Sequence, residues 1–196
     1  MIDLIILIIL ILIFIWFVLG FTIPILIFPL MPIKKRDIPK KIPKELEQEI
    51  NKLKKIKNKE KFLKAALGYI RKNFRSDIPL LFTKISKHFY KDLEEIMKEK
   101  GFFPCHIQNF ILKVILIKSK KFSNKDIEYQ YCFYSGVIHS YLKVKINGKY
   151  INADPWGYTR GLPFGHRSLG PLLDWITLKK YKKFLKKGNN YIYRSQ

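Results

Sequence analysis

The sequence predicts an α+β protein in which helices come first, a small antiparallel sheet follows, and one further apolar helix stands at the N-terminus. Residues 4–33 carry no charged side chain and consist mainly of Ile, Leu and Phe. Apolar residues recur at helical spacing from about Pro43 to Ile117. Asn147 and Gly148 then separate two strand-like runs, and an Asn-Gly pair there is the strongest short-range signal for a β-hairpin.

The apolar N-terminal segment predicts a membrane-spanning helix. A bilayer core of about 30 Å needs about 20 apolar residues, and the span is expected to run from Leu4 to about Pro24. A cleaved signal peptide is the alternative, but Asp3 and the lack of an A-x-A-like site favour an uncleaved anchor. Basic residues follow the span and Asp3 precedes it. The positive-inside rule therefore predicts a single-pass protein of the cell membrane with its C-terminal domain in the cytoplasm.

The chain divides into three predicted parts. Residues 1–33 form the transmembrane anchor, and residues 34–44 form a basic linker stiffened by prolines. Residues 45–196 form one domain, which is long enough for its own hydrophobic core. No internal repeat is present.

The net charge of +23, from 38 Lys and Arg against 15 Asp and Glu, suits attraction to anionic lipid or nucleic acid. A general compositional bias explains it as well, because Lys greatly outnumbers Arg. No nucleic-acid motif with interleaved aromatic residues is present, so nucleic acid is not expected as a partner. Weak attraction to the anionic lipid beside the anchor is expected. A basic module that only binds lipid or nucleic acid remains a third, weaker hypothesis.

The first half of the domain is predicted to be helical. Apolar spacing indicates one long or two abutting helices from about Pro43 to Phe74, followed by a break at residues 76–79. A further amphipathic helix is predicted from Phe82 to Met97, with Gly101 as its C-terminal cap. The run from residue 107 to 117 is apolar nearly all round, which predicts a buried helix with Pro104 as its first residue.

The second half is predicted to begin with a strand. Residues 127–134 are rich in aromatic side chains and read as that strand, which turns at Ser135-Gly136 toward the hairpin. Residues 157–170 form a glycine-rich loop, either a wall that faces substrate or a simple connector. Residues 171–187 form a basic amphipathic helix that covers an edge of the fold or lies on a membrane surface.

Cys105 is placed in the first turn of the buried helix. Unpaired backbone N–H groups and the positive end of the helix dipole favour a thiolate at such a position, and the thiolate is the nucleophilic form of cysteine. The alternative is that Cys105 is a small buried apolar residue.

The register of the hairpin brings a histidine and an aspartate together. A two-residue turn sets Leu142 opposite Ala153 and Tyr141 opposite Asp154. His139 then lies on the same face as Asp154, as its diagonal neighbour at about 7–8 Å between Cα atoms.

This arrangement resembles the transglutaminase-like superfamily of papain-like thiol enzymes. The resemblance covers roughly residues 60–170 and is most specific in H-x-Y-L-x-V-x-I-x-G-K-Y-I-N-A-D-P-W, residues 139–156. It implies a papain-like core and acyl transfer at amide bonds of a protein or peptide substrate. Cys105 would be the nucleophile, His139 the acid and base, and Asp154 the orienting carboxylate. Water as acceptor gives a peptidase or amidase and an amine gives a cross-link, and both remain open.

One feature of the superfamily is not found in the sequence. Its members place a side-chain donor upstream of the cysteine to complete the oxyanion hole, and here the only upstream Gln is Gln48. Asn73, Tyr69 or His88 are possible substitutes. Loss of such a donor costs about 100- to 1000-fold in rate. A catalytically inactive binding or scaffold module therefore stays as the alternative function.

Several other residues receive weaker assignments. Trp156, Gly165 and His166 are candidate substrate-binding residues because they lie beside the triad or in the glycine-rich loop. His106 is expected to point elsewhere on its helix and to be structural or a local tuning charge. Cys132 is expected in the strand core, and two cysteines do not make a disulfide framework, which agrees with a reducing compartment.

No metal or cofactor is expected. Cys105, Cys132, His106 and His139 lack the C-x2-C or H-x3-H spacing of a zinc site. Phosphate-binding loops and dinucleotide fingerprints are absent as well.

Overall fold

The computed structural model describes residues 2–27, 36–89, 92–134 and 137–186. Within α1, side chains are described at residues 4–16 and 18. The helices are α1 (Ile2–Ile27), α2 (Lys44–Lys54), α3 (Lys59–Asn73), α4 (Ile78–Thr83), α5 (Leu93–Glu99), α6 (Cys105–Lys118), α7 (Pro155–Thr159) and α8 (Pro171–Lys186), with 3₁₀ turns η2 (Ile85–His88) and η3 (Asn124–Asp126). The strands are β1 (Phe74–Arg75), β2 (Gly101–Phe102), β3 (Ile127–Tyr134), β4 (Val137–Ile146) and β5 (Lys149–Ala153). The predicted α+β class is confirmed.

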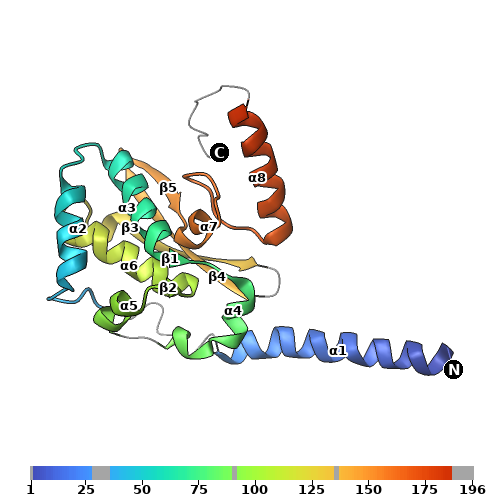
Figure 1. Cartoon of the computed structure of the whole chain (residues 1–196). Helices are drawn as coiled ribbons and strands as arrows, with labels where there is room; N and C mark the ends of the chain where they lie inside the picture. The colour runs from blue at the N-terminus through green and yellow to red at the C-terminus, as the bar shows by residue number, and fades with distance from the viewer. Residues whose placement is uncertain (1, 28–35, 90–91, 135–136, 187–196) are drawn as a thin grey trace.

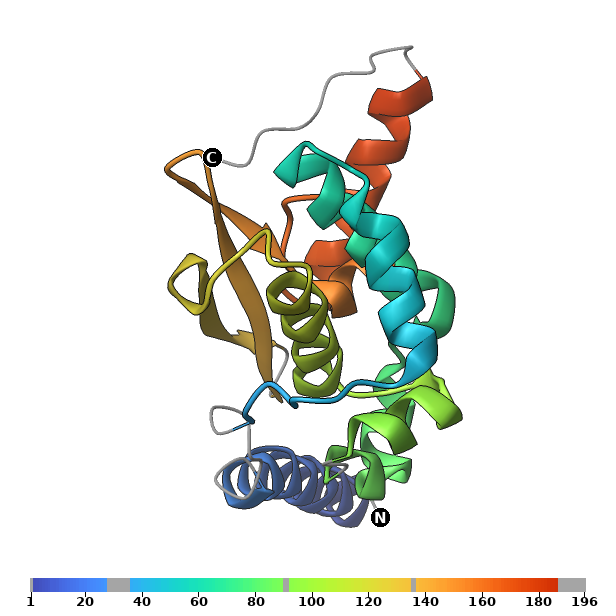
Figure 2. The same cartoon turned by 90° about the vertical axis from the view of Figure 1, so that its left-hand side faces the viewer.

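Helix α6 lies at the centre of the domain. Figure 2 shows it between the sheet of β3, β4 and β5 on one side and helices α2 and α3 on the other, and both α3 and β4 pack against it. Its side chains are buried nearly all round, as the apolar sequence predicts. The core also includes apolar residues of α2, α3 and α5, with Leu46, Ile50, Phe62, Leu63, Ile70, Ile96 and Ile111 among its fully buried members. A helix enclosed in this way holds its N-terminal residue in a fixed place.

The predicted hairpin is confirmed with its register. Leu142 pairs with Ala153, Val144 with Ile151, and β3 joins on the other edge of β4 to give the order β3-β4-β5. Asn147 (φ 50°) and Gly148 (φ 80°) both have positive φ, as a type I′ turn requires. The predicted turn at Ser135-Gly136 lies outside the described residues.

A short parallel pair was not predicted from the sequence. Strand β1 follows α3 and pairs with β2, so that Phe74 lies opposite Gly101 and Arg75 opposite Phe102. The pair links the end of α3 to the segment that leads into α6. It therefore helps to position Cys105.

The first predicted helical stretch is two helices, α2 and α3. They separate at Asn58, whose side chain accepts hydrogen bonds from the N–H groups of Glu60 and Lys61 and so begins α3. The predicted break after Phe74 is confirmed at residues 76–77, although Ile78 and Pro79 already begin α4.

The predicted single helix from Phe82 to Met97 is wrong. This region is α4, η2 and α5. Lys84, with φ −115° and ψ 52°, interrupts the helical backbone after α4, and Asp92 begins α5 by accepting a hydrogen bond from the N–H of Glu94. Helix α5 ends at Glu99 with Lys100 (φ 46°) as its C-cap, and the predicted Gly101 follows with φ 78°, the left-handed backbone that favours glycine after a helix. Pro104 is the N-cap of α6 and not its first helical residue, so Cys105 opens the helix.

Helix α1 is 26 residues long, and its described side chains are apolar and exposed, for example Leu4 at 60% and Trp16 at 75%. Figure 1 shows it extending away from the rest of the chain. Counted over the described residues alone, no helix is long and apolar enough to cross a membrane. The transmembrane anchor stays a prediction.

Two glycine substitutions test the backbone of this fold. Both Gly148 in the hairpin turn and Gly68 in α3 have open space where a Cβ would stand, but only Gly148 has positive φ. We expect Gly148→Ala to lower the free energy of unfolding by about 1 kcal/mol, because the left-handed backbone penalises a side chain. Gly68→Ala is the matched control and should raise it by about 0.8 kcal/mol. Urea denaturation of both variants measures the change in the free energy of unfolding relative to wild type. A change of the same sign in both variants would contradict the positive φ of Gly148.

Candidate active site

Cys105 is the first residue of α6, directly after the N-cap Pro104. Its side chain is partly exposed, whereas its neighbours His106 and Ile107 are buried. The N-terminal end of a buried helix thus presents one sulfur atom where the helix dipole favours negative charge.

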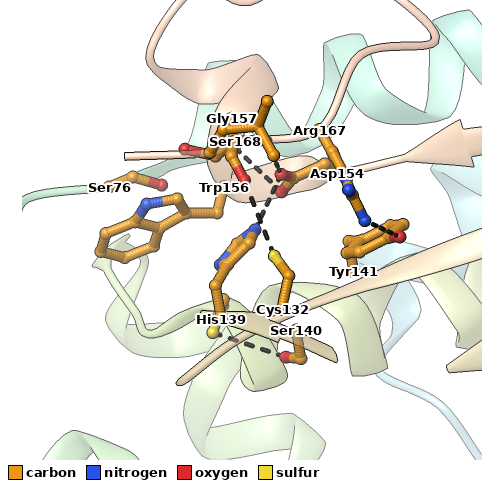
Figure 3. Close-up of polar contacts among 12 residues, drawn as sticks. Ser76, Cys132, His139, Ser140, Tyr141, Asp154, Trp156, Gly157, Arg167 and Ser168 are labelled. Carbon is orange, nitrogen blue, oxygen red and sulfur yellow. Dashed lines mark hydrogen bonds and ion pairs between the residues drawn. The ribbon is translucent and has the colours of Figure 1, made fainter. Parts of the chain in front are cut away.

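His139 and Asp154 meet as the hairpin register predicts. His139 Nε2 and Asp154 Oδ2 are 2.8 Å apart, and the residues are only 3% and 2% exposed. Figure 3 shows the His139 ring pointing at the carboxylate. Because Nε2 is occupied by Asp154, the other ring nitrogen, Nδ1, is left to face the thiol.

Two backbone amides complete the surroundings of Asp154. The N–H of Gly157 donates to Oδ1 at 3.0 Å, and the N–H of Ser168 donates to Oδ2 at 2.7 Å. The first of these makes Asp154 the N-cap of α7. Three donors from three segments therefore fix the orientation of one buried carboxylate.

The electrostatics favour a thiolate and an imidazolium. Burial opposes the charge on Cys105, but hydrogen bonds with His106 and His139 and the positive charge of the His139 imidazolium hold the pKa of the thiol well below its usual value. Burial likewise opposes the charge on His139, but the Asp154 carboxylate and the Cys105 sulfur raise the pKa of the imidazole well above its usual value. Between these two pKa values the pair is charged.

His106 departs from the sequence expectation. It was expected to point elsewhere on the helix, yet its buried ring interacts with the Cys105 sulfur and helps to lower the pKa of the thiol. A role as a local tuning charge stays a prediction. A side chain at the second position of a helix can fold back over the first turn, and helical spacing does not reveal that.

Cys132 lies in β3 directly opposite His139, and its sulfur is 3.8 Å from the carbonyl oxygen of Ser168. Burial raises the pKa of Cys132, and this effect exceeds the lowering by His139 and Arg167. Cys132 is therefore a neutral thiol beside the site, in contrast to Cys105.

The glycine-rich segment packs over the triad. Gly165 forms a bridge with Asn152, and Trp156 is buried with its ring edge-on to Phe102. Burial lowers the pKa of His166, which keeps its ring neutral. The candidate substrate-binding residues Trp156, Gly165 and His166 thus lie in or next to the segment that covers Asp154. Their contact with a substrate stays a prediction.

Asp174 secures this segment from α8. Its carboxylate accepts hydrogen bonds from the Ser168 hydroxyl, from the N–H of Leu169 at 2.9 Å and from Arg160 Nη1 at 3.3 Å. Asp174 is buried, and the amide of the same Ser168 holds Asp154. Sequence reasoning missed both residues, although Asp174 is the one acidic residue in the basic sequence of α8.

Of the possible upstream donors, Tyr69 and Asn73 lie in the last turns of α3, Gln48 lies on α2 and His88 lies in η2. Asn73 Nδ2 donates to the carbonyl of Tyr69 at 2.9 Å, and burial with Glu45 and Glu49 raises the pKa of Tyr69. Gln48 is exposed on α2. The side chain of His88 is outside the described part of the chain.

Gln108 joins three segments near the nucleophile. Its side-chain amide Nε2 donates to the carbonyl oxygen of Phe103 at 2.7 Å and lies 3.2 Å from Ser76 Oγ. Ser76 Oγ is in turn 2.5 Å from Thr159 Oγ1. The segment before α6, the segment after β1 and α7 are thereby connected around the start of α6.

A cavity of about 730 Å³ lies elsewhere, between residues 36–45, α5 and Phe110. None of the triad residues lines it. Within the described ranges, no group of three or more His, Cys, Asp or Glu side chains is placed to hold a metal ion.

Comparisons with known proteins assign no family to the chain. No protein-family model matches it, and neither a curated protein nor a solved structure does so. The resemblance to transglutaminase-like enzymes therefore rests on the residues themselves and stays a prediction.

Replacement of Asp174 tests the support of the triad. Asp174→Ala removes one acceptor of hydrogen bonds from the Ser168 hydroxyl, the Leu169 amide and Arg160, and we expect a loss of about 3 kcal/mol in the free energy of unfolding. Asp77→Ala is the control, because Asp77 precedes α4 and makes no capping hydrogen bond with its side chain. Denaturant titration measures the free energy of unfolding of both variants. A loss below about 1 kcal/mol for Asp174→Ala would contradict a stabilising role of the Asp174 hydrogen bonds.

Proposed function

We propose that this chain is a transglutaminase-like thiol enzyme with a papain-like core that acts on amide bonds of proteins or peptides. The proposal is carried by one hydrogen-bonded line from Asp154 through His139 to Cys105 at the N-terminus of a buried helix. A nucleophile, a base within reach and a group that orients the base are the parts that covalent acyl transfer requires.

In the first half-reaction the Cys105 thiolate attacks the carbonyl carbon of the amide. The His139 imidazolium gives its proton to the leaving amine, the C–N bond breaks, and a thioester forms. Asp154 stabilises the imidazolium and holds the ring so that Nδ1 faces the sulfur.

In the second half-reaction the thioester is resolved. His139, now neutral, takes a proton from water as the oxygen attacks the thioester carbonyl, and the C–S bond breaks to release the acid and the thiolate. An amine in place of water gives a new amide by the same steps. Hydrolysis is the more general outcome wherever water reaches the thioester.

A catalytically inactive binding or scaffold module is the second candidate function. It is favoured by Asn73, whose side-chain amide donates to the carbonyl oxygen of Tyr69, and by Gln48, which is exposed on α2. A site without a side-chain oxyanion donor loses about 100- to 1000-fold in rate. Reactivity of the thiol separates the two candidates.

Thiol labelling across pH tests the ion pair. The full chain in detergent is treated with limiting iodoacetamide from about pH 5 to about pH 9, and each cysteine is followed by mass mapping. We expect Cys105 to react well below about pH 8, because its pKa is lowered, and Cys132 to react slowly, because its pKa is raised. His139→Ala should move the Cys105 profile up toward that of a free thiol. Labelling of wild-type Cys105 no faster than a free thiol would favour the binding module.

The same pair makes stability depend on pH. The contribution of Cys105, whose folded pKa is lowered, is lost as the pH falls through that lowered value. The contribution of His139, whose folded pKa is raised, is lost as the pH rises through that raised value. Wild type should therefore exceed Cys105→Ser in stability most between the two pKa values. Thermal unfolding at a series of pH values measures this difference, and a difference that is constant with pH would argue against the pair.

We also propose that α1 anchors the enzyme in a membrane. The proposal is supported by a 26-residue helix, about 39 Å long, whose described side chains are apolar and exposed. Lysine at both Ile8 and Leu12 should release the chain from the membrane fraction, because each charge costs about 3 kcal/mol at the centre of a span. The control exchanges the same residues for Leu and Ile. Retention of the double lysine variant after alkaline carbonate extraction would refute the anchor.

A further inference from the structure

The sulfur of Cys105 has a neighbour outside the triad. Ser140, the residue after His139 in β4, has its Oγ 3.4 Å from Cys105 Sγ. Its side chain is not used by any step of the mechanism above. At this distance a hydroxyl hydrogen-bonds to a sulfur that carries negative charge.

The direction of this hydrogen bond is set by Asn109. Asn109 Nδ2 donates to Ser140 Oγ at 3.0 Å, and an amide nitrogen can only donate. The hydroxyl oxygen therefore accepts from Asn109, and its single proton is left for the sulfur. Cys105 and Asn109 are four residues apart on α6, which places both on the face of the helix that meets β4.

Burial keeps this chain of hydrogen bonds intact. Asn109 is 0% exposed and Ser140 is 2% exposed, so water does not compete for either group. The remaining oxygen of the amide, Asn109 Oδ1, has no partner among the described residues. A buried polar atom without a hydrogen bond lowers the stability of the fold, so its presence in the core calls for an explanation such as a role in the site.

We propose that Ser140 is a further catalytic residue that donates its hydroxyl proton to the Cys105 sulfur, and that Asn109 is a positioning residue that orients this hydroxyl. The inference rests on the proposed function. Ser140 stabilises the thiolate before it attacks the amide carbonyl. It does so again when the C–S bond of the thioester breaks and the charge returns to sulfur.

Ser140 differs in kind from the other groups around the sulfur. The titratable groups that face Cys105 are His106, His139, Tyr131 and Cys132. Each of them changes its effect when it gains or loses a proton. The hydroxyl of Ser140 keeps its one proton across the whole working range of pH, so it supports the thiolate independently of the state of His139.

The experiment compares pH profiles of Cys105 alkylation in the full chain. Ser140→Ala removes the donor and should raise the pH of half-maximal labelling by about one pH unit, which is a tenfold change in proton affinity. Ser140→Thr keeps the hydroxyl and should stay close to wild type. If wild-type Cys105 is labelled well below about pH 8 and Ser140→Ala gives the same profile, the inference about Ser140 is overturned and the proposed triad is not affected. If wild-type Cys105 is labelled only at the pH at which a free thiol reacts, the proposed function is overturned instead.

Asn109→Leu provides a second variant in case Ser140→Ala does not fold. It keeps the approximate size of the side chain and removes the donor, so the hydroxyl loses its orientation and the profile should move up by less than in Ser140→Ala. If Asn109 instead accepted the Ser140 proton, the substitution would free the hydroxyl for the sulfur and the profile would move down. A downward shift therefore contradicts the proposed direction of the hydrogen bond.

Discussion

The buried hydrogen bond between His139 and Asp154 is the interaction on which the rest of the site depends. A carboxylate with almost no exposed surface is costly unless donors surround it. Here those donors come from β4, from α7 and from the segment before α8, at His139, Gly157 and Ser168. The fold after the hairpin is therefore arranged to satisfy one charge. Removal of any of the three donors leaves that charge partly unmet and also releases a segment of the chain.

The second constraint is the enclosure of α6. Because helices cover one side of it and the sheet covers the other, the position of Cys105 follows from packing over the whole length of the helix. The pair of β1 and β2 and the hydrogen bonds of Gln108 fix the segment that enters the helix. A sulfur held in this way needs little reorganisation before it attacks, which is the usual benefit of a preorganised site.

The register of the hairpin could be predicted, and the start of α6 to within one residue, because Asn147-Gly148 and Pro104 are strong local signals. A two-residue turn fixes the register, and a period of two then decides which side chains share a face. The prediction of one helix from Phe82 to Met97 is wrong because its apolar spacing continues across the non-helical Lys84 and across Asp92, which caps a new helix. A local cap overrides periodicity, and the periodic pattern does not show it.

The remaining parts of the site depend on contacts that no local pattern encodes. Ser168 and Asp174 meet through an irregular loop, and Asn109 meets Ser140 across 31 positions of sequence. Asn109 also lies within a run that reads as uniformly apolar, so it is absorbed into the helix pattern. His106 adjoins the nucleophile in sequence, but its direction depends on a rotamer and not on spacing.

The backbone amides and the hydroxyl that donate to Asp154 and to Cys105 are neutral groups. With a thiolate, an imidazolium and a carboxylate in place, the three residues together hold one net negative charge in a largely buried position. The amides of Gly157 and Ser168 and the hydroxyl of Ser140 stabilise this negative charge by donating hydrogen bonds to Asp154 and Cys105. A lysine or arginine in their place would stabilise the thiolate, but it would also pull the proton off His139, which must keep it for the leaving amine. Neutral donors stabilise the thiolate and the carboxylate without adding a positive charge that would lower the pKa of His139.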